Sequence, residues 1–92
     1  FKSGDVFVNH KPVSLTAREL DLLYFFISNK NQILSKEQIY SKVWGYETFV
    51  DDNTLMVHIR TLRRKIEENP NQPKFIKTMR GKGYIFKGEN HE

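Results

Sequence analysis

The chain has 92 residues, of which 38% are hydrophobic and 13% aromatic, enough for the core of one small domain that we expect to span residues 1–92. It has no cysteine, which excludes a disulfide scaffold, a thiol nucleophile and a zinc site built on thiolates. No apolar run approaches the roughly 18–20 residues that span a bilayer, and residues 1–10 do not form a signal sequence. We therefore expect a soluble, cytoplasmic domain with no membrane partner.

The formal net charge of +4 is unevenly distributed along the chain. Residues 58–87 contain nine Lys and Arg against two Glu, whereas residues 1–57 contain six basic and seven acidic residues. A basic excess confined to one segment favours a surface that binds a polyanion. A solvated helix face in a basic protein would have the same charge, so both interpretations stay open at this point.

The N-terminal residues predict two strands. Residues 6–8 and 12–15 have strand character, and residues 9–11 between them are typical of a turn. The chain opens without Met or a helix cap. We therefore expect a fragment of a longer protein, with the remainder on the N-terminal side.

Two capping boxes predict the first two helices. Thr16 and Glu19 begin a helix that runs to about Ser28, and Ser35 and Gln38 begin a second over residues 36–44. Gly45 ends the second helix, and residues 46–50 follow as a loop. The expected staple pairs are Leu15 with Leu20 and Leu34 with Ile39. The expected inward side chains are Leu20, Leu23, Phe26 and Ile27 in the first helix, and Ile39, Tyr40 and Val43 in the second.

A third helix is predicted from a cap at residues 51–53 to about Glu68, before Asn69 and Pro70. Helical periodicity gathers one narrow apolar stripe toward the core: Leu55, Ile59, Leu62 and Ile66. The opposite face is polar and basic: Asn53, Val57, Arg60, Thr61 and Arg64. His58 and Arg63 lie on its flanks, and Met56 is expected at the edge of the core.

The C-terminal part predicts a β-hairpin over about residues 75–87, with a basic, glycine-rich tip at residues 80–83. Ile76 and residues 84–86 are expected to form its buried face. Strands, three helices and a terminal hairpin are the plan of a winged helix-turn-helix. The predicted fold class is therefore α+β.

No constellation of residues supports catalysis. His10, His58 and His91 lack metal-ligand spacing. The Gly81-Lys82-Gly83 sequence lies in a hairpin rather than before a helix, so it is not a phosphate-binding loop. Adjacent Asp51 and Asp52 are typical of a helix cap. We expect no enzyme activity, no cofactor and no metal.

The third helix instead has the character of a helix that reads DNA. Arg60 and Arg64 lie one turn apart on its outward face, and arginine bonds guanine O6 and N7 in the major groove. Val57 and Thr61 are suited to contact thymine methyl groups. The alternative for the two arginines is solvated charge, or phosphate contact without base recognition.

The hairpin tip and the second helix supply further candidate DNA contacts. Arg80, beside two glycines, suits the narrow minor groove, although an ordinary exposed turn arginine would look the same. Trp44 could donate its indole N–H to a phosphate or belong to the core, and His58 and Arg63 could contact phosphate or make structural hydrogen bonds. The predicted phosphate-contacting residues are Ser35, Lys36, Trp44, Asn53, His58, Arg63, Lys77, Lys82 and Tyr84.

Four blocks of sequence, in order, resemble the DNA-binding effector domain of OmpR/PhoB-type response regulators. They are Leu15-Thr16-x-x-Glu19-x-x-Leu22-Leu23, Ser35-x-x-x-Ile39-x-x-x-Val43-Trp44-Gly45, Val57-His58-Ile59-Arg60-x-Leu62-Arg63-x-Lys65-Ile66 and Ile76-x-Thr78-x-Arg80-Gly81-x-Gly83-Tyr84. The resemblance covers roughly residues 13–87. Asn53 and Met56 depart from it, since the family commonly has Arg and Asp there, and Thr61 replaces a second Arg.

The resemblance implies sequence-specific binding of double-stranded DNA by the output domain of a two-component system that controls transcription. It implies a recognition helix at about residues 53–68, with Val57, Arg60, Thr61 and Arg64 at the bases, and a wing with Arg80 in the minor groove. It further implies an N-terminal sheet, partly truncated here, and a receiver domain on the N-terminal side.

The implied partners follow from the same family. They are tandem DNA repeats bound by a dimer, RNA polymerase through the 46–52 loop, the receiver domain, and a cognate histidine kinase. A competing hypothesis is a winged helix that binds another protein through the third helix. Such a surface would favour large apolar anchors, whereas this face carries Arg60, Thr61 and Arg64 with Val57 as its apolar member.

Overall fold

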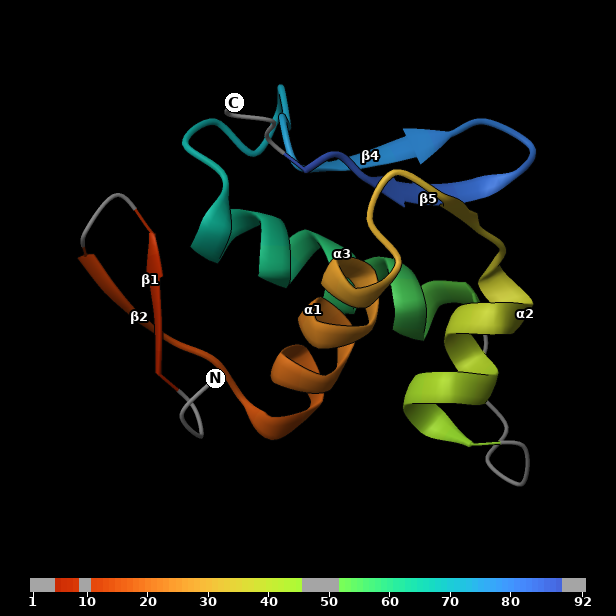
Figure 1. Cartoon of the computed structure of the whole chain (residues 1–92), viewed down its shortest axis with the longest axis horizontal. Coiled ribbons are helices and arrows are strands. Elements are labelled where there is room, and N and C mark those ends of the chain that lie inside the picture. The colour runs from red at the N-terminus through yellow and green to blue at the C-terminus, as the bar shows by residue number, and fades with distance from the viewer. Residues whose placement is uncertain (1–4, 9–10, 46–51, 89–92) are drawn as a thin grey trace.

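The computed structural model describes residues 5–8, 11–45 and 52–88. Along the chain run β1 (Asp5–Val8), β2 (Lys11–Ser14), α1 (Ala17–Ser28), β3 (Ile33–Leu34), α2 (Lys36–Ile39), η1 (Tyr40–Trp44), α3 (Asp52–Ile66), β4 (Ile76–Met79) and β5 (Gly83–Phe86) (Figure 1). Most of the predicted 46–52 loop, and His10 and His91, lie outside the described residues. No helix in the described ranges is long and apolar enough to cross a membrane.

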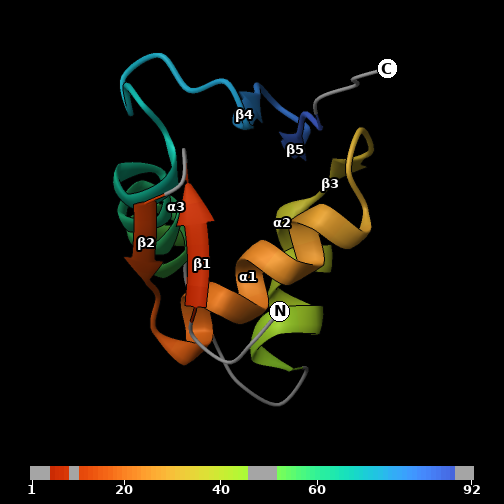
Figure 2. The same cartoon turned by 60° about the vertical axis from the view of Figure 1, so that its left-hand side comes forward.

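The N-terminal strands form the expected hairpin. β1 and β2 pair antiparallel, with Asp5 opposite Ser14 and Val8 opposite Lys11. Figures 1 and 2 both place this small sheet beside α3, away from β4 and β5. The N-terminal sheet and the C-terminal hairpin therefore lie on different sides of the helices.

The predicted capping box begins α1. The backbone N–H of Glu19 donates to Thr16 Oγ1 (3.1 Å), and the backbone N–H of Thr16 donates to a Glu19 carboxylate oxygen (3.0 Å). The predicted apolar stripe was partly wrong, because Ile27 is 36% exposed while Leu22 is fully buried. Glu19 is itself buried on the same face as Leu22. Because a charged residue lies on the core side of this helix, the sequence pattern assigned that side to the surface.

The second helix occupies the predicted span, but it is not α-helical throughout. Ser35 and Gln38 form the expected capping box, and Gly45 ends the segment with φ +91°. Residues 40–44 form a π-helix, in which the Gly45 N–H donates to the Tyr40 carbonyl (3.0 Å). Ile39 and Val43 are buried as predicted, and Tyr40 is half-buried.

The predicted core stripe of α3 is confirmed, because Leu55, Ile59, Leu62 and Ile66 are all buried. The helix ends at Ile66, two residues before the predicted end at Glu68. The Glu67 N–H still completes the helical ladder to the Arg63 carbonyl (2.8 Å), but its side chain bonds the chain that enters β4.

The C-terminal hairpin is confirmed and belongs to a three-stranded sheet. β4 and β5 pair antiparallel from Ile76 opposite Phe86 to Met79 opposite Gly83. β3 adds to the other edge of β5, which gives the order β3-β5-β4. The sequence did not predict β3, because two residues between helices carry no periodicity. Since β3 leads directly into α2, the sheet ties the hairpin to the second helix.

Candidate nucleic-acid interface

The side of α3 away from the core is open, as its periodicity predicted. Val57, Arg60 and Arg64 are exposed, and Thr61 is half-buried. The Thr61 hydroxyl donates to the Val57 carbonyl (2.9 Å) within the helix. Because the Thr61 hydroxyl is engaged in this bond, its methyl group is the part of the side chain left for an apolar contact. Arg60 and Arg64 lie one helical turn apart.

Trp44 links the end of η1 to the first turns of α3. Its ring lies edge-to-face against the His58 ring, with the centroids 5.1 Å apart, and the Arg18 guanidinium lies 5.2 Å from the indole centroid. Arg18 also donates to the Val43 carbonyl. Trp44 is half-buried, so it packs against the protein, and its predicted phosphate contact stays a prediction.

His58 is fixed by its own helix. Its Nδ1 lies 2.8 Å from the Thr54 carbonyl, and because a carbonyl only accepts, Nδ1 carries the proton in this contact. The ring packs against Trp44. The structural hydrogen bond anticipated for His58 is therefore present, and its predicted phosphate contact stays a prediction.

Arg63 makes structural hydrogen bonds between α3 and β4. Its Nε and Nη2 donate to the Ile76 carbonyl (3.0 and 2.8 Å), and Nη2 also donates to Thr78 Oγ1 (2.9 Å). Burial lowers the pKa of Arg63, against the opposing effects of Tyr84 and Glu67. Of the two roles anticipated for Arg63, the structure shows the hydrogen-bonding one, with the guanidinium committed to the hairpin.

Glu67, one turn further along the chain from Arg63, bonds the backbone N–H groups at the start of the same strand. Its buried carboxylate accepts the backbone N–H groups of Lys74 (2.8 Å), Phe75 (3.0 Å to the nearer oxygen) and Ile76 (2.9 Å). We call Arg63 and Glu67 the α3–β4 bracket. Together they fix the position of the hairpin relative to the exposed face of α3.

Lys65 joins α3 to the start of α1. Its Nζ donates to the Glu19 carboxylate at 2.7 Å. Burial raises the pKa of Glu19, but the hydrogen bonds from Lys65 and Thr16 outweigh it, so the pKa lies below its ordinary value. The predicted basic helix therefore uses one of its cations, the half-buried Lys65, in an ion pair with α1.

The hairpin tip is basic, exposed and closely packed at one point. Lys77, Arg80 and Lys82 are exposed, and Gly81 turns the chain with φ +77°. A side chain at Gly83 would place Cβ 2.0 Å from the Leu34 carbonyl oxygen, so only glycine fits there. The start of β5 is thus packed closely against the end of β3.

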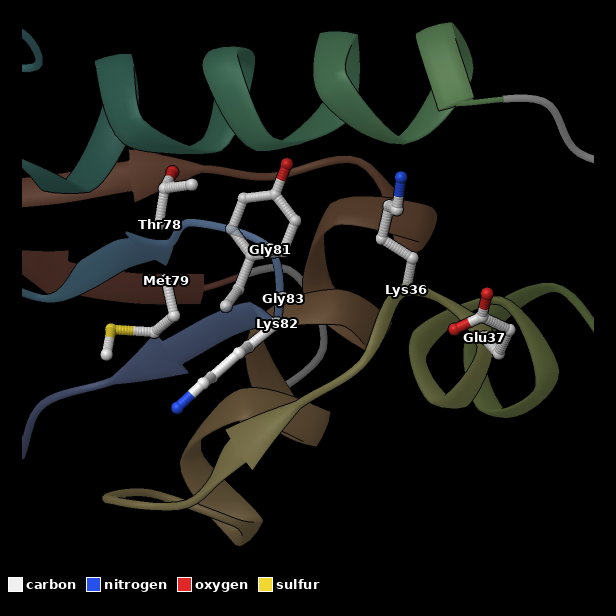
Figure 3. A pocket seen from close by; sticks show the side chains of 8 residues that line it. Lys36, Glu37, Thr78, Met79, Gly81, Lys82 and Gly83 are labelled. Atoms are coloured by element: carbon white, nitrogen blue, oxygen red, sulfur yellow. The ribbon is translucent and has the colours of Figure 1, made fainter.

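Two clefts flank the hairpin. The first, about 310 Å³, lies between the tip and the start of α2, and Figure 3 shows the ammonium groups of Lys36 and Lys82 pointing in different directions. The second, about 520 Å³, is a groove between α3 and the hairpin. It is lined by Met56, Ile59, Arg60, Arg63, Arg64, Pro70, Asn71, Thr78 and Tyr84.

Several residues differ from their expected environment. Met56, expected at the core edge, is 51% exposed because Leu55 and Ile59 already fill the core at that level. Tyr84 is buried and lines both clefts. The Ser35 hydroxyl accepts from the Gln38 N–H (3.1 Å), so its cap role occupies it. Asn53 is exposed.

Arg18 and Glu67 position this surface, and sequence reasoning missed both. Arg18 is an ordinary polar residue in the first turn of α1, and no local signal relates it to Trp44, 26 positions later. Glu67 offered no local signal either, because adjacent helix residues do not share a face and its bonding partners come from the chain entering β4.

Comparison with known proteins identifies a family of transcriptional regulators that this chain matches over most of its length. Residues 10–86 match the family described as transcriptional regulatory protein, C terminal. The transcriptional regulatory protein YvrH of Bacillus subtilis is 48% identical over 85 residues, which cover 92% of this chain and 36% of YvrH. The chain thus spans about a third of the length of the curated relatives that it matches.

Two solved structures share the fold. DrrB of Thermotoga maritima, a response regulator described as an OmpR/PhoB homolog, superposes with a TM-score of 0.83 and 31% identity over 91% of this chain and 38% of DrrB. The DNA-binding domain of Klebsiella pneumoniae RstA, solved in complex with the RstA box, superposes with a TM-score of 0.80 and 29% identity, covering 90% of this chain and 82% of that one.

Proposed function

The chain belongs to the family of C-terminal domains of transcriptional regulatory proteins, and from this membership we propose how it binds DNA. It is a winged-helix DNA-binding domain of the OmpR/PhoB type that controls transcription, and not an enzyme, as the sequence predicted. In our proposal α3 lies in the major groove and the β4–β5 hairpin lies over an adjacent minor groove. The RstA domain in complex with its box is the structural precedent for DNA binding by this fold.

The observation that carries this proposal is the two-sidedness of α3. Four buried side chains fix one edge of the helix in the core, so the edge with Arg60 and Arg64 has to face outward. An α-helix fits the major groove, where guanidinium groups recognise guanine and apolar groups recognise thymine. In our proposal Arg60 and Arg64 form hydrogen bonds to bases, and Val57 and the Thr61 methyl group make apolar contacts with bases.

Backbone contacts position the domain. We assign these to the start of α2 (Ser35 through its backbone, and Lys36), to Trp44 and His58, to Asn53, and to Lys77 and Lys82 on the hairpin, with Arg80 entering the minor groove. Arg63 and Tyr84, predicted as phosphate contacts, act in our proposal by shaping the groove and holding the hairpin.

The full-length protein is the subject of further proposals. Because the matched relatives are about three times as long as this chain, we propose that it is the output part of a two-component response regulator. A receiver domain phosphorylated by a histidine kinase would promote dimerisation on tandem DNA repeats. Repeats about 10–11 bp apart would place both recognition helices on one side of the duplex. In our proposal residues 46–52 contact RNA polymerase.

Selection from a pool of randomised duplexes tests the docking. The selection should enrich duplexes that share one defined DNA sequence. The logarithm of the affinity for that duplex should fall with the logarithm of the salt concentration, at a slope of about −0.9 per phosphate contact for about four to six contacts. Arg64→Ala should cost about 1–3 kcal/mol at one base position. A flat salt response would refute the docking. It would also be refuted if the Arg64→Ala variant selected the same sequences as the wild type and protein footprinting showed that DNA protects a surface other than α3.

A further inference from the structure

Met56 is an exposed apolar side chain on the second turn of α3. Half of it (51%) is accessible, although leucine and isoleucine at neighbouring positions of the same helix are fully buried. Leu55 and Ile59 therefore complete the core without it. An apolar side chain that contributes so little to packing on a basic helix is available for a ligand.

The surroundings of Met56 identify the class of ligand. Asn53 and Arg60 are its neighbours three and four positions away, and both are exposed. It lines the 520 Å³ groove together with Arg60, Arg63 and Arg64. Because exposed Arg60 and Arg64 line the same groove as Met56, it suits a polyanion that has an apolar feature better than it suits a wholly apolar surface.

We propose that Met56 determines specificity by contacting the 5-methyl group of a thymine beside the base that Arg60 binds. The inference rests on the proposed docking of α3 in the major groove. The thymine methyl is the apolar feature of base edges there, and the first turns of a recognition helix are those that contact bases. Methionine is unbranched and polarisable, so it adapts to such a contact.

Replacement of thymine by uracil tests this contact, because it removes the methyl group and leaves base pairing intact. In the duplex selected with the wild-type domain, each thymine is replaced in turn, and affinity is measured by fluorescence anisotropy. At the thymine that Met56 contacts, affinity should fall about threefold to fivefold, the effect of one buried methyl group. The Met56→Ala domain should lose nothing further at that position.

Two variants act as controls. Met56→Leu should keep most of the uracil effect, because it keeps an apolar side chain of similar size. Val57→Ala should keep the full uracil effect at the Met56 position, because its side chain points elsewhere on the helix. Alanine is a strong helix former, so Met56→Ala should fold, which far-UV circular dichroism checks.

The outcomes separate this inference from the proposed function. A selected duplex in which no uracil effect depends on Met56, or which has no thymine in the footprint of α3, would overturn the role of Met56 while leaving the docking of α3 intact. If the wild-type domain bound no duplex at all, both the role of Met56 and the docking of α3 would be overturned. Uracil effects of equal size in wild type and Met56→Ala would also overturn the contact.

Discussion

The α3–β4 bracket makes a measurable contribution to stability through Glu67. Glu67→Gln keeps the size of the side chain but replaces one carboxylate oxygen by an NH₂ group, which cannot accept. The two oxygens accept three backbone N–H groups between them, and the Ile76 N–H is buried. The variant therefore leaves at least one of these donors without an acceptor, at a cost of about 1–3 kcal/mol, and loses charge assistance at the others.

We expect Glu67→Gln to lower the free energy of unfolding by about 2–3 kcal/mol. For a domain of this size that corresponds to roughly 10–20 °C in the thermal midpoint. Urea and thermal denaturation followed by circular dichroism measure both quantities. Glu68→Gln is the matched control, because this neighbouring side chain is exposed and its loss should change stability by less than about 0.5 kcal/mol. Equal stability of the two variants would refute the reasoning.

Three further predictions concern other parts of the structure. Glu19, whose pKa is lowered in the folded state, stabilises the domain above its ordinary pKa and loses this effect as the pH falls through the lowered value. The stability difference between wild type and Glu19→Gln in urea should therefore be present at about pH 7 and shrink by about pH 3; a constant difference would contradict the Lys65 contact. In thermal denaturation, Gly83→Ala should lower the free energy of unfolding by more than about 2 kcal/mol and Gly81→Ala by about 1 kcal/mol. Only a Cβ at Gly83 would meet neighbouring backbone atoms. Similar losses in the two variants would be inconsistent with that close approach. Arg80→Ala should weaken binding more to duplexes with an A·T-rich flank than to G·C-rich ones, and equal losses in anisotropy titrations would remove the minor-groove contact.

Local signals in the sequence predicted most of the framework. Both capping boxes and the core stripe of α3 depend on residues within a few positions of one another, so one sequence is enough to recognise them. The hairpin was predictable for the same reason, since Gly81 and Gly83 mark its turn. The exposed side of α3 followed directly from its buried stripe.

Features that depend on distant residues were not predictable. The roles of Glu67 and Arg63 arise only when the hairpin returns to the helix, and Arg18 meets Trp44 only in the folded chain. Met56 was misplaced because an apolar residue beside a core stripe is ordinarily packed, and here the core is already complete.

The single tryptophan of the chain has a practical consequence. Trp44 lies against His58 on the helix that we place in the major groove, and the Arg18 guanidinium covers its ring. Its fluorescence therefore reports on one place, where η1 meets the DNA-facing helix. Emission spectra of the unlabelled domain should follow docking directly, without a dye on either molecule.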